Sequence, residues 1–254
     1  MYFDSLTHIT ADGRWYNTAH DATVSRLLNV CSRAHVSKAL LVGMPNCAQE
    51  HILMASNTYR DLFIPIAGLN PTQFHDQNEL FDYLNHLKQK GYRGVKLHPR
   101  FGKHLPDCKE VHWVLDSCAK LNMVVLLCTM WGPPTPLMTK SVKNTVHHLC
   151  EATNGATLIL VHGCTTDILS ISDIIVKYSN VLIDASYTII KYIESSVRQD
   201  LEYLMKHCDK KLIIGSDFPE FTYDDVLKTI AKYFGDINKD KIDNVTFRNL
   251  DQIF

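Results

Sequence analysis

The sequence predicts a single (β/α)₈ barrel, the TIM-barrel fold, over residues 1–254. Of the 254 residues, 46% are hydrophobic and 21% charged, which is the composition of a globular domain. Eight short apolar runs alternate with segments of helical periodicity, and about 250 residues is the usual length of such a barrel. This alternation predicts parallel strands joined by right-handed crossovers. No linker-like stretch or internal repeat divides the chain.

The predicted strands are short apolar runs, most of them rich in Val, Ile and Leu. Runs of this length and composition are typical of strands that are covered on both faces. They comprise residues 2–9, 39–45, 63–71, 94–99, 124–130, 157–164, 181–186 and 212–219.

The predicted helices are stripes of apolar residues spaced three or four positions apart. Five such stripes begin at Val24, Leu80, Val111, Ile168 and Ile193. Gly91 follows the second stripe, where glycine commonly ends a helix. An open doubly wound sheet shows the same alternation but favours a glycine-rich turn after its first strand. Residues 9–13 contain one glycine, so we predict the closed barrel.

The charge balance indicates the kind of partner to expect. The chain carries 26 Lys and Arg against 27 Asp and Glu, so we expect neither nucleic acid nor a membrane surface as a partner. The first residues have no signal-peptide pattern, and no apolar run approaches the roughly 20 residues that span a bilayer. We therefore expect a cytoplasmic protein whose eight cysteines are reduced.

Ionisable or ligand-type residues end six of the eight predicted strands. Barrels of this kind carry their chemistry at the C-terminal ends of the strands. Burying such groups costs free energy unless they pair with one another or bind a ligand. The set comprises Asp4, His8, Lys96, His98, Arg100, Cys128, His162, Asp184 and Asp217.

Four of these segments resemble motifs of the amidohydrolase superfamily. They are the His-bearing first strand, Gly94-Val95-Lys96-Leu97-His98-Pro99, Val161-His162-Gly163 and Gly215-Ser216-Asp217-Phe218-Pro219. The order of these motifs and the strands that carry them are similar to those of the amidohydrolase-related branch. This branch consists of small metal-dependent barrels and includes decarboxylases and lactone hydrolases. Asn249 in the last helix extends the resemblance over nearly the whole chain. The resemblance implies an enzyme on the TIM-barrel fold.

The resemblance also implies a metal site, but with a degenerate ligand set. The family has His-x-His on strand one, where this chain has Leu6 and His8, and a histidine on strand five, where it has Cys128. The remaining candidate ligands are His8, His162 and Asp217, with Cys128 as a fourth. Zinc accepts nitrogen, sulfur and oxygen donors, so zinc is the implied cofactor. A weak or absent metal site is compatible with the same residues.

The reaction that the resemblance implies is hydrolysis of a C–N bond or a lactone ester in a small molecule. A metal lowers the pKa of bound water from about 15.7 towards 7, and Asp217 is placed to accept the proton of that water. Lys96, His98 and Arg100 are candidates for binding or polarising an anionic or carbonyl-bearing small molecule. Trp131 and Tyr187 follow predicted strands and are candidates for contacting the substrate.

Two alternatives remain open at the level of the sequence. In a metal-independent hydrolase or decarboxylase, Asp217 acts directly as the base, and Lys96 with His98 supplies the electrophile. In a barrel that has lost catalysis, the same mouth serves a binding role. Each residue also has a structural interpretation, in which Lys96 pairs with Asp4 or Asp184 and Cys128 is a small core residue.

Overall fold

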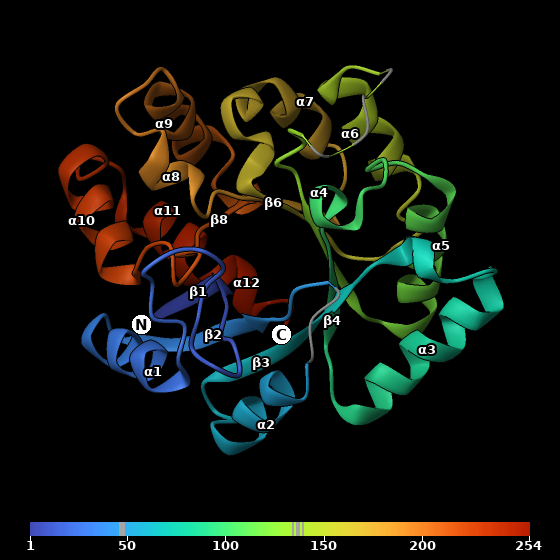
Figure 1. Cartoon of the computed structure of the whole chain (residues 1–254). Coiled ribbons are helices and arrows are strands. Elements are labelled where there is room, and N and C mark those ends of the chain that lie inside the picture. Colours follow the sequence, from blue (N-terminus) through green and yellow to red (C-terminus); the bar gives the residue numbers. More distant parts are fainter. Residues whose placement is uncertain (46–48, 134, 136–137, 139) are drawn as a thin grey trace.

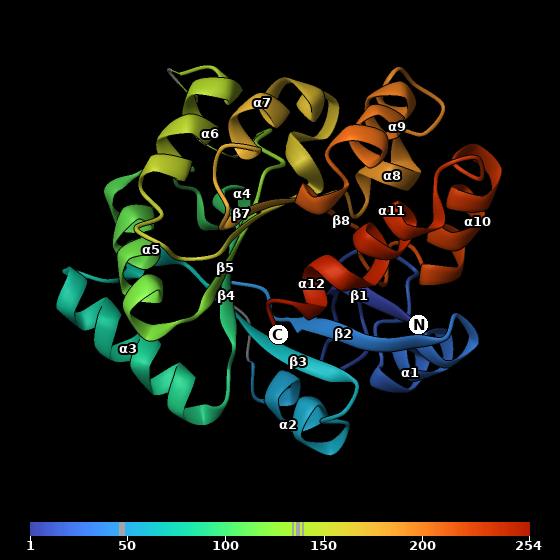
Figure 2. The same ribbon diagram turned by 180° about the vertical axis from the view of Figure 1, so that it is seen from behind.

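The computed structural model describes residues 1–45, 49–133, 135, 138 and 140–254, and these residues form the predicted barrel. Eight parallel strands lie in sequence order in one sheet, and each is hydrogen-bonded to the next. Helices surround the sheet (Figure 1, Figure 2). The strands are β1 (Tyr2–Thr7), β2 (Val36–Val42), β3 (Phe63–Leu69), β4 (Gly94–Leu97), β5 (Val124–Cys128), β6 (Leu158–Val161), β7 (Val181–Asp184) and β8 (Leu212–Ile213).

The segment that follows β8 closes the barrel against β1. The backbone N–H of Asp217 donates to the carbonyl of Leu6 at 3.0 Å, and that of His8 donates to the carbonyl of Phe218 at 2.8 Å. A parallel bridge joins Thr7 to Phe218. The polar ends of the first and last strands are therefore neighbours in space.

Helices follow the strands as the alternation predicts. They are α1 (Val24–Arg33), α2 (Glu50–Thr58), α3 (Gln77–Lys90), α4 (Pro99–Gly102), α5 (Lys109–Leu121), α6 (Val142–Glu151), α7 (Ser172–Ile175), α8 (Thr188–Lys191), α9 (Val197–His207), α10 (Tyr223–Tyr233), α11 (Lys239–Asp243) and α12 (Asn249–Asp251). Thr23, Asp76 and Ser141 cap α1, α3 and α6 by accepting backbone N–H bonds of the first turn. Gly91 ends α3 at φ +107°, as predicted. Within the described ranges, no helix is long and apolar enough to cross a membrane.

Two of the predicted helical stripes differ from the structure. The stripe from Ile168 becomes a 3₁₀ turn followed by the one-turn helix α7. The stripe from Ile193 is helical only from Val197, whose N–H is bound by the hydroxyl of Ser195 at 3.3 Å. Serine side chains that bond to nearby backbone groups compete in this way with a continuous helix.

The strands separate two apolar cores. The inner core fills the barrel and includes Leu6 and Leu126, and the outer core between sheet and helices includes Val125 and Leu127. Successive side chains of a strand point to opposite faces. Cys128, two residues after Leu126, therefore faces the barrel interior. The same alternation turns Lys96 of β4 towards the interior, because Lys96 pairs with Leu126 in the sheet.

The last residues of the chain cover the N-terminal end of the barrel. Leu250 belongs to the inner core, and Ile253 and Phe254 pack against it. The side-chain amide of Asn249 donates to the carbonyl of Leu212 at 2.8 Å and ties α12 to the start of β8. Asn249, which forms part of the family resemblance in the sequence, thus has a structural role here.

Candidate active site

A cleft of about 220 Å³ opens where the C-terminal ends of the strands meet. Seven of the nine predicted site residues line it, and Trp131 and Cys128 do not. Six further lining residues were not singled out by the sequence pattern, because most lie on loops with no periodicity. The predicted residues in the cleft are His8, Lys96, His98, Arg100, His162, Tyr187 and Asp217, and the additional ones are Trp15, Tyr16, Met44, Phe101, Met130 and Glu220.

His8 lies at the centre of the polar floor. Its Nδ1 donates to the carbonyl of Val42 at 2.6 Å, so the lone pair is on Nε2. That Nε2 is 3.2 Å from Lys96 Nζ and 3.7 Å from Asp217 Oδ1. Burial, together with the charge of Lys96, lowers the pKa of His8 well below its usual value. The imidazole of His8 is therefore neutral and accepts a hydrogen bond from Lys96.

His162 and Asp217 form a second electrostatic unit. Burial disfavours charge on His162, but the Asp217 carboxylate and the neighbouring Cys128 outweigh it and raise the pKa of His162 to about 9. Burial raises the pKa of Asp217, while His162 and Lys96 oppose that rise. The Nδ1 of His162 donates to the carbonyl of Ser186 at 3.0 Å. The pair thus places a proton donor beside a carboxylate of raised basicity.

Four cleft residues have backbone conformations that L-residues rarely adopt. The φ angles are +50° at Tyr16, +68° at His162, +63° at Tyr187 and +59° at Asp217. Such conformations cost about 1–3 kcal/mol each and cluster at functional sites, where the surrounding structure holds them. Their coincidence in one cleft independently marks it as the functional region.

Cys128 lies beneath the cleft and is fully buried. Burial raises the pKa of its thiol, but the flanking imidazoles of His98 and His162 have the larger combined effect and bring the pKa well below the usual value. The Nδ1 of His98 is buried and has no hydrogen-bond partner among the described residues. The imidazole of His98 thus lies beside Cys128 and also lines the cleft.

The buried carboxylates of Asp4 and Asp184 have structural roles. Asp4 accepts bonds from Ser216 N at 2.8 Å and Ser216 Oγ at 2.6 Å. Asp184 accepts from Ser5 Oγ at 2.6 Å, and from the backbone N–H and hydroxyl of Ser186. In the part of the chain that the structure describes, neither acid forms an ion pair with Lys96. The structural pairing considered for Lys96 is therefore not observed there.

The predicted substrate-contacting residues have different positions. The guanidinium of Arg100 lies 5.3 Å from the Phe101 ring centre at the cleft rim. Tyr187 meets His162 edge-on at a centroid separation of 5.8 Å. The indole N–H of Trp131 donates to the carbonyl of Cys128 at 2.9 Å, and its ring packs against the outer core. Trp131 therefore supports the end of β5 and does not line the cleft.

The four predicted metal ligands do not form a coordination shell. Over residues 1–45, 49–133, 135, 138 and 140–254, no group of three or more His, Cys, Asp and Glu side chains is arranged to hold a metal ion. Leu6 supplies no donor, and the Nε2 of His8 faces the amino group of Lys96. The donor set as arranged thus does not fit the zinc site that the resemblance implies, because a cationic side chain adjoins the nitrogen that would bind the metal.

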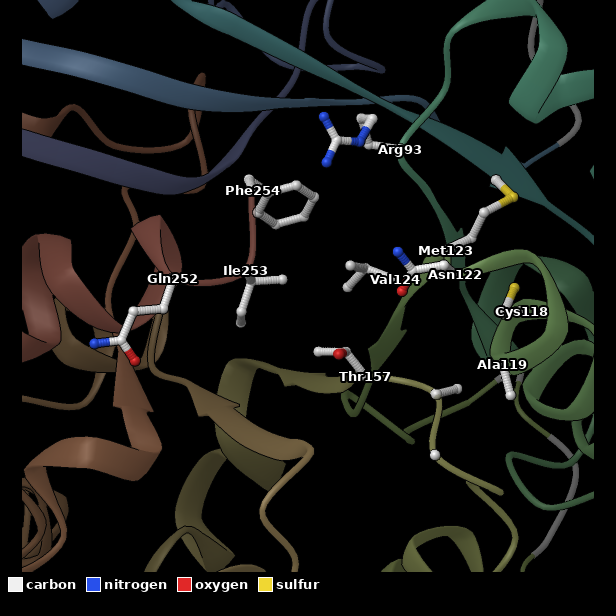
Figure 3. A pocket seen from close by; sticks show the side chains of 12 residues that line it. Arg93, Cys118, Ala119, Asn122, Met123, Val124, Thr157, Gln252, Ile253 and Phe254 are labelled. Atoms are coloured by element: carbon white, nitrogen blue, oxygen red, sulfur yellow. The ribbon is translucent and has the colours of Figure 1, made fainter.

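A second pocket, of about 260 Å³, lies at the opposite end of the barrel. Figure 3 shows the side chains that line it, among them Arg93, Val124 and Thr157, which precede or begin β4, β5 and β6. None of the predicted site residues lines this pocket. Residues at this end of a TIM barrel serve stability rather than chemistry. The cleft at the C-terminal strand ends is therefore the candidate active site.

Fold and cleft together define a (β/α)₈ barrel with an ionisable site at its C-terminal mouth. Several solved structures share the barrel fold. An uncharacterised TIM-barrel protein from Bordetella bronchiseptica matches with a TM-score of 0.81 at 13% identity, over 99% of this chain and 97% of that one. A probable 2-pyrone-4,6-dicarboxylic acid hydrolase from Acinetobacter baumannii, with citric acid bound, matches with a TM-score of 0.69 at 19% identity, over 99% and 98%.

A third similar structure is the 5-carboxyvanillate decarboxylase of Novosphingobium aromaticivorans, in complex with manganese and a nitrobenzoic acid. It has a TM-score of 0.68 at 10% identity, over 100% of this chain and 95% of that one. Neither a protein-family model nor a curated protein matches the sequence. The similar structures confirm the predicted TIM-barrel fold.

Proposed function

We propose that the protein is a metal-independent hydrolase of a small anionic substrate that carries an ester or amide carbonyl. The observation that carries the proposal is the 3.2 Å contact between Lys96 Nζ and His8 Nε2. Lys96 brings a positive charge to the nitrogen that would otherwise ligate a metal. A fixed cation in a desolvated site is able to stabilise a developing oxyanion.

The residues of the floor have complementary roles in the proposed reaction. Asp217 accepts the proton of the attacking water, and its raised pKa suits a general base. Lys96 and His98, which both line the cleft, favour negative charge on the oxygen of the substrate carbonyl. His162, whose pKa is about 9, donates a proton to the leaving group. His8, which contacts Lys96 Nζ at 3.2 Å, orients that amino group.

The proposed substrate is small and anionic because of the size and charge of the cleft. A volume of about 220 Å³ lies below the usual range for drug-sized ligands. Arg100 lies at the rim, and no carboxylate forms an ion pair with it among the residues that the structure describes. Its guanidinium is suited to bind a carboxylate. Citric acid in the similar A. baumannii hydrolase supports the same class of ligand.

The test is hydrolysis of a panel of small lactones and amides that carry a carboxylate, with and without prior chelator treatment. We expect turnover to survive the chelator, with metal content well below one equivalent. Asp217→Asn is expected to lose about 10²–10⁴-fold in kcat/KM, and Lys96→Met about 10²–10³-fold. Asp200→Asn, on α9 and outside the cleft, is the control and should keep its activity.

Two outcomes would overturn this proposal. Activity that disappears with the chelator and returns with zinc would establish the metal-dependent hydrolase that the family resemblance implies. Activity retained by Asp217→Asn would remove Asp217 as the base. Melting temperatures of each variant separate loss of chemistry from loss of folding.

A further inference from the structure

Five rings form a continuous chain of contacts across the cleft, from one floor histidine to another. His8 stacks on Trp15 at a centroid separation of 5.2 Å, and Trp15 meets Tyr16 edge-on at 4.8 Å. Tyr16 stacks on Phe101 at 5.4 Å with an interplanar angle of 21°, and Phe101 contacts His98 at 4.3 Å. We call these five residues the aromatic arch, and all of them line the cleft.

The two halves of the arch come from different parts of the barrel. Trp15 and Tyr16 lie between β1 and α1, whereas Phe101 lies in α4, directly after β4. Because β2 and β3 separate β1 from β4 in the sheet, the Tyr16–Phe101 contact crosses the mouth. This contact joins segments that are far apart in the sequence.

Exposure identifies the Tyr16–Phe101 stack as the outer boundary of the cleft. Tyr16 is 52% exposed and Phe101 36% exposed, while Trp15 and His98 beneath them are 6% and 4% exposed. Tyr16 also has φ +50°, a conformation that is uncommon for a residue with a bulky side chain. A half-exposed pair of rings, held in this way over ionisable groups, forms a cover.

We propose that Tyr16 and Phe101 determine the substrate specificity of the cleft, because their stacked rings cover it and favour flat, unsaturated anions over puckered, saturated ones. The inference rests on the proposed function in one respect, which is the anion site at Lys96 and Arg100. A ring face contacts a flat ligand over its whole area, whereas the hydrogens of a saturated ring hold the two apart. Two aromatic rings pack with their centroids about 4.5–7 Å apart. A puckered ligand ring does not pack face to face on an aromatic side chain in this way.

The position of Phe101 connects this selection to the polar floor. Its ring is 4.3 Å from the ring centre of His98 and 5.3 Å from the guanidinium carbon of Arg100. A flat anion beside Phe101 therefore lies close to the guanidinium of Arg100 at the rim and to the imidazole of His98. The flatness of the substrate would thus determine both its binding affinity and the position of its reacting group in the cleft.

The probes for this proposal are benzoate and cyclohexanecarboxylate, which have the same charge and the same number of carbons but differ in flatness. Their binding is measured by calorimetry, so no turnover is needed. One aromatic contact changes a binding constant by about 2- to 13-fold. We expect the wild-type protein to bind benzoate at least about threefold more tightly. A merely apolar pocket has the opposite preference, because the saturated acid has more apolar surface to bury.

The variants separate the cover from general packing. Phe101→Leu keeps an apolar side chain but loses the ring, and the benzoate preference should fall to about one. Phe101→Tyr and Tyr16→Phe keep both rings and should keep the preference. Tyr83→Leu is the matched control, because Tyr83 is 37% exposed and pairs with Phe74 at 5.2 Å outside the cleft. That control should bind both acids as the wild type does.

Three results would overturn the proposed role of Tyr16 and Phe101, and one of them would also overturn the proposed hydrolase function. Equal affinities of the wild-type protein for the two acids, or a preference that survives Phe101→Leu, would refute the role of the cover and leave the hydrolase proposal intact. No binding of either acid at millimolar concentration would remove the anion site, and with it both proposals. Benzoate selectivity without any hydrolytic activity would refute the hydrolase and support the cover.

Discussion

Asp4→Asn should remove a pH dependence of folding that the buried carboxyl of Asp4 imposes. Asp4 is 2% exposed and holds the segment after β8 against β1 by accepting bonds from Leu6 N, Ser216 N and Ser216 Oγ. Burial raises the pKa of Asp4 from 3.8 to about 7, although these three hydrogen bonds favour the charged form. Asp4 holds Ser216, the residue before Asp217. Its buried carboxyl therefore makes the free energy of unfolding depend on pH.

The direction and size of the effect follow from the two pKa values. Between pH 3.8 and about 7 the folded state keeps the Asp4 proton and the unfolded state has lost it. The unfolded state then binds fewer protons, so the contribution of Asp4 to the free energy of unfolding is present below pH 3.8 and falls as the pH rises through this window. At about 1.36 kcal/mol per pKa unit, the loss is on the order of 4 kcal/mol.

Asparagine preserves the bonding geometry and cannot titrate. Its carbonyl oxygen can accept from both N–H groups, and its amide N–H can donate to the Ser216 hydroxyl. Urea unfolding at pH 4 to 8 measures the effect. We expect wild type and Asp4→Asn to have similar stability near pH 4, and the variant to be more stable by on the order of 4 kcal/mol at pH 8. Parallel pH profiles for the two proteins would refute the reasoning.

Two further predictions concern stability. Asp76→Ala removes the side chain that caps α3 through Asn78 N and Glu79 N, and should cost about 1 kcal/mol in urea unfolding, while Asp76→Asn should cost much less. Leu126→Ala leaves a cavity in the inner core and should cost about 2–5 kcal/mol, with a lower melting temperature. A core variant that melts with the wild type would show that the barrel interior is not close-packed.

The sequence alone was sufficient to predict the barrel and most of the residues of its mouth. Strand runs, helical stripes and the closing Gly91 are local patterns, and each reflects a period or a turn preference that is independent of distant residues. The strand ends of such a fold meet at one face, so His8, Lys96, His162 and Asp217 could be grouped before any distance was known. Two stripes form less continuous helix than predicted, because a serine side-chain bond delays the start of one helix and a 3₁₀ turn interrupts the other.

The tertiary structure decided how those residues meet. The 3.2 Å approach of Lys96 to His8 depends on strand register and rotamers, which no periodicity encodes. Trp131 turns to the carbonyl of Cys128 rather than to the cleft, because its loop path is set by packing. The Tyr16–Phe101 stack joins two connecting segments across the mouth and follows only from the closure of the barrel. Local chemistry determines which elements form, whereas contacts between distant segments arise from the packing of the whole chain.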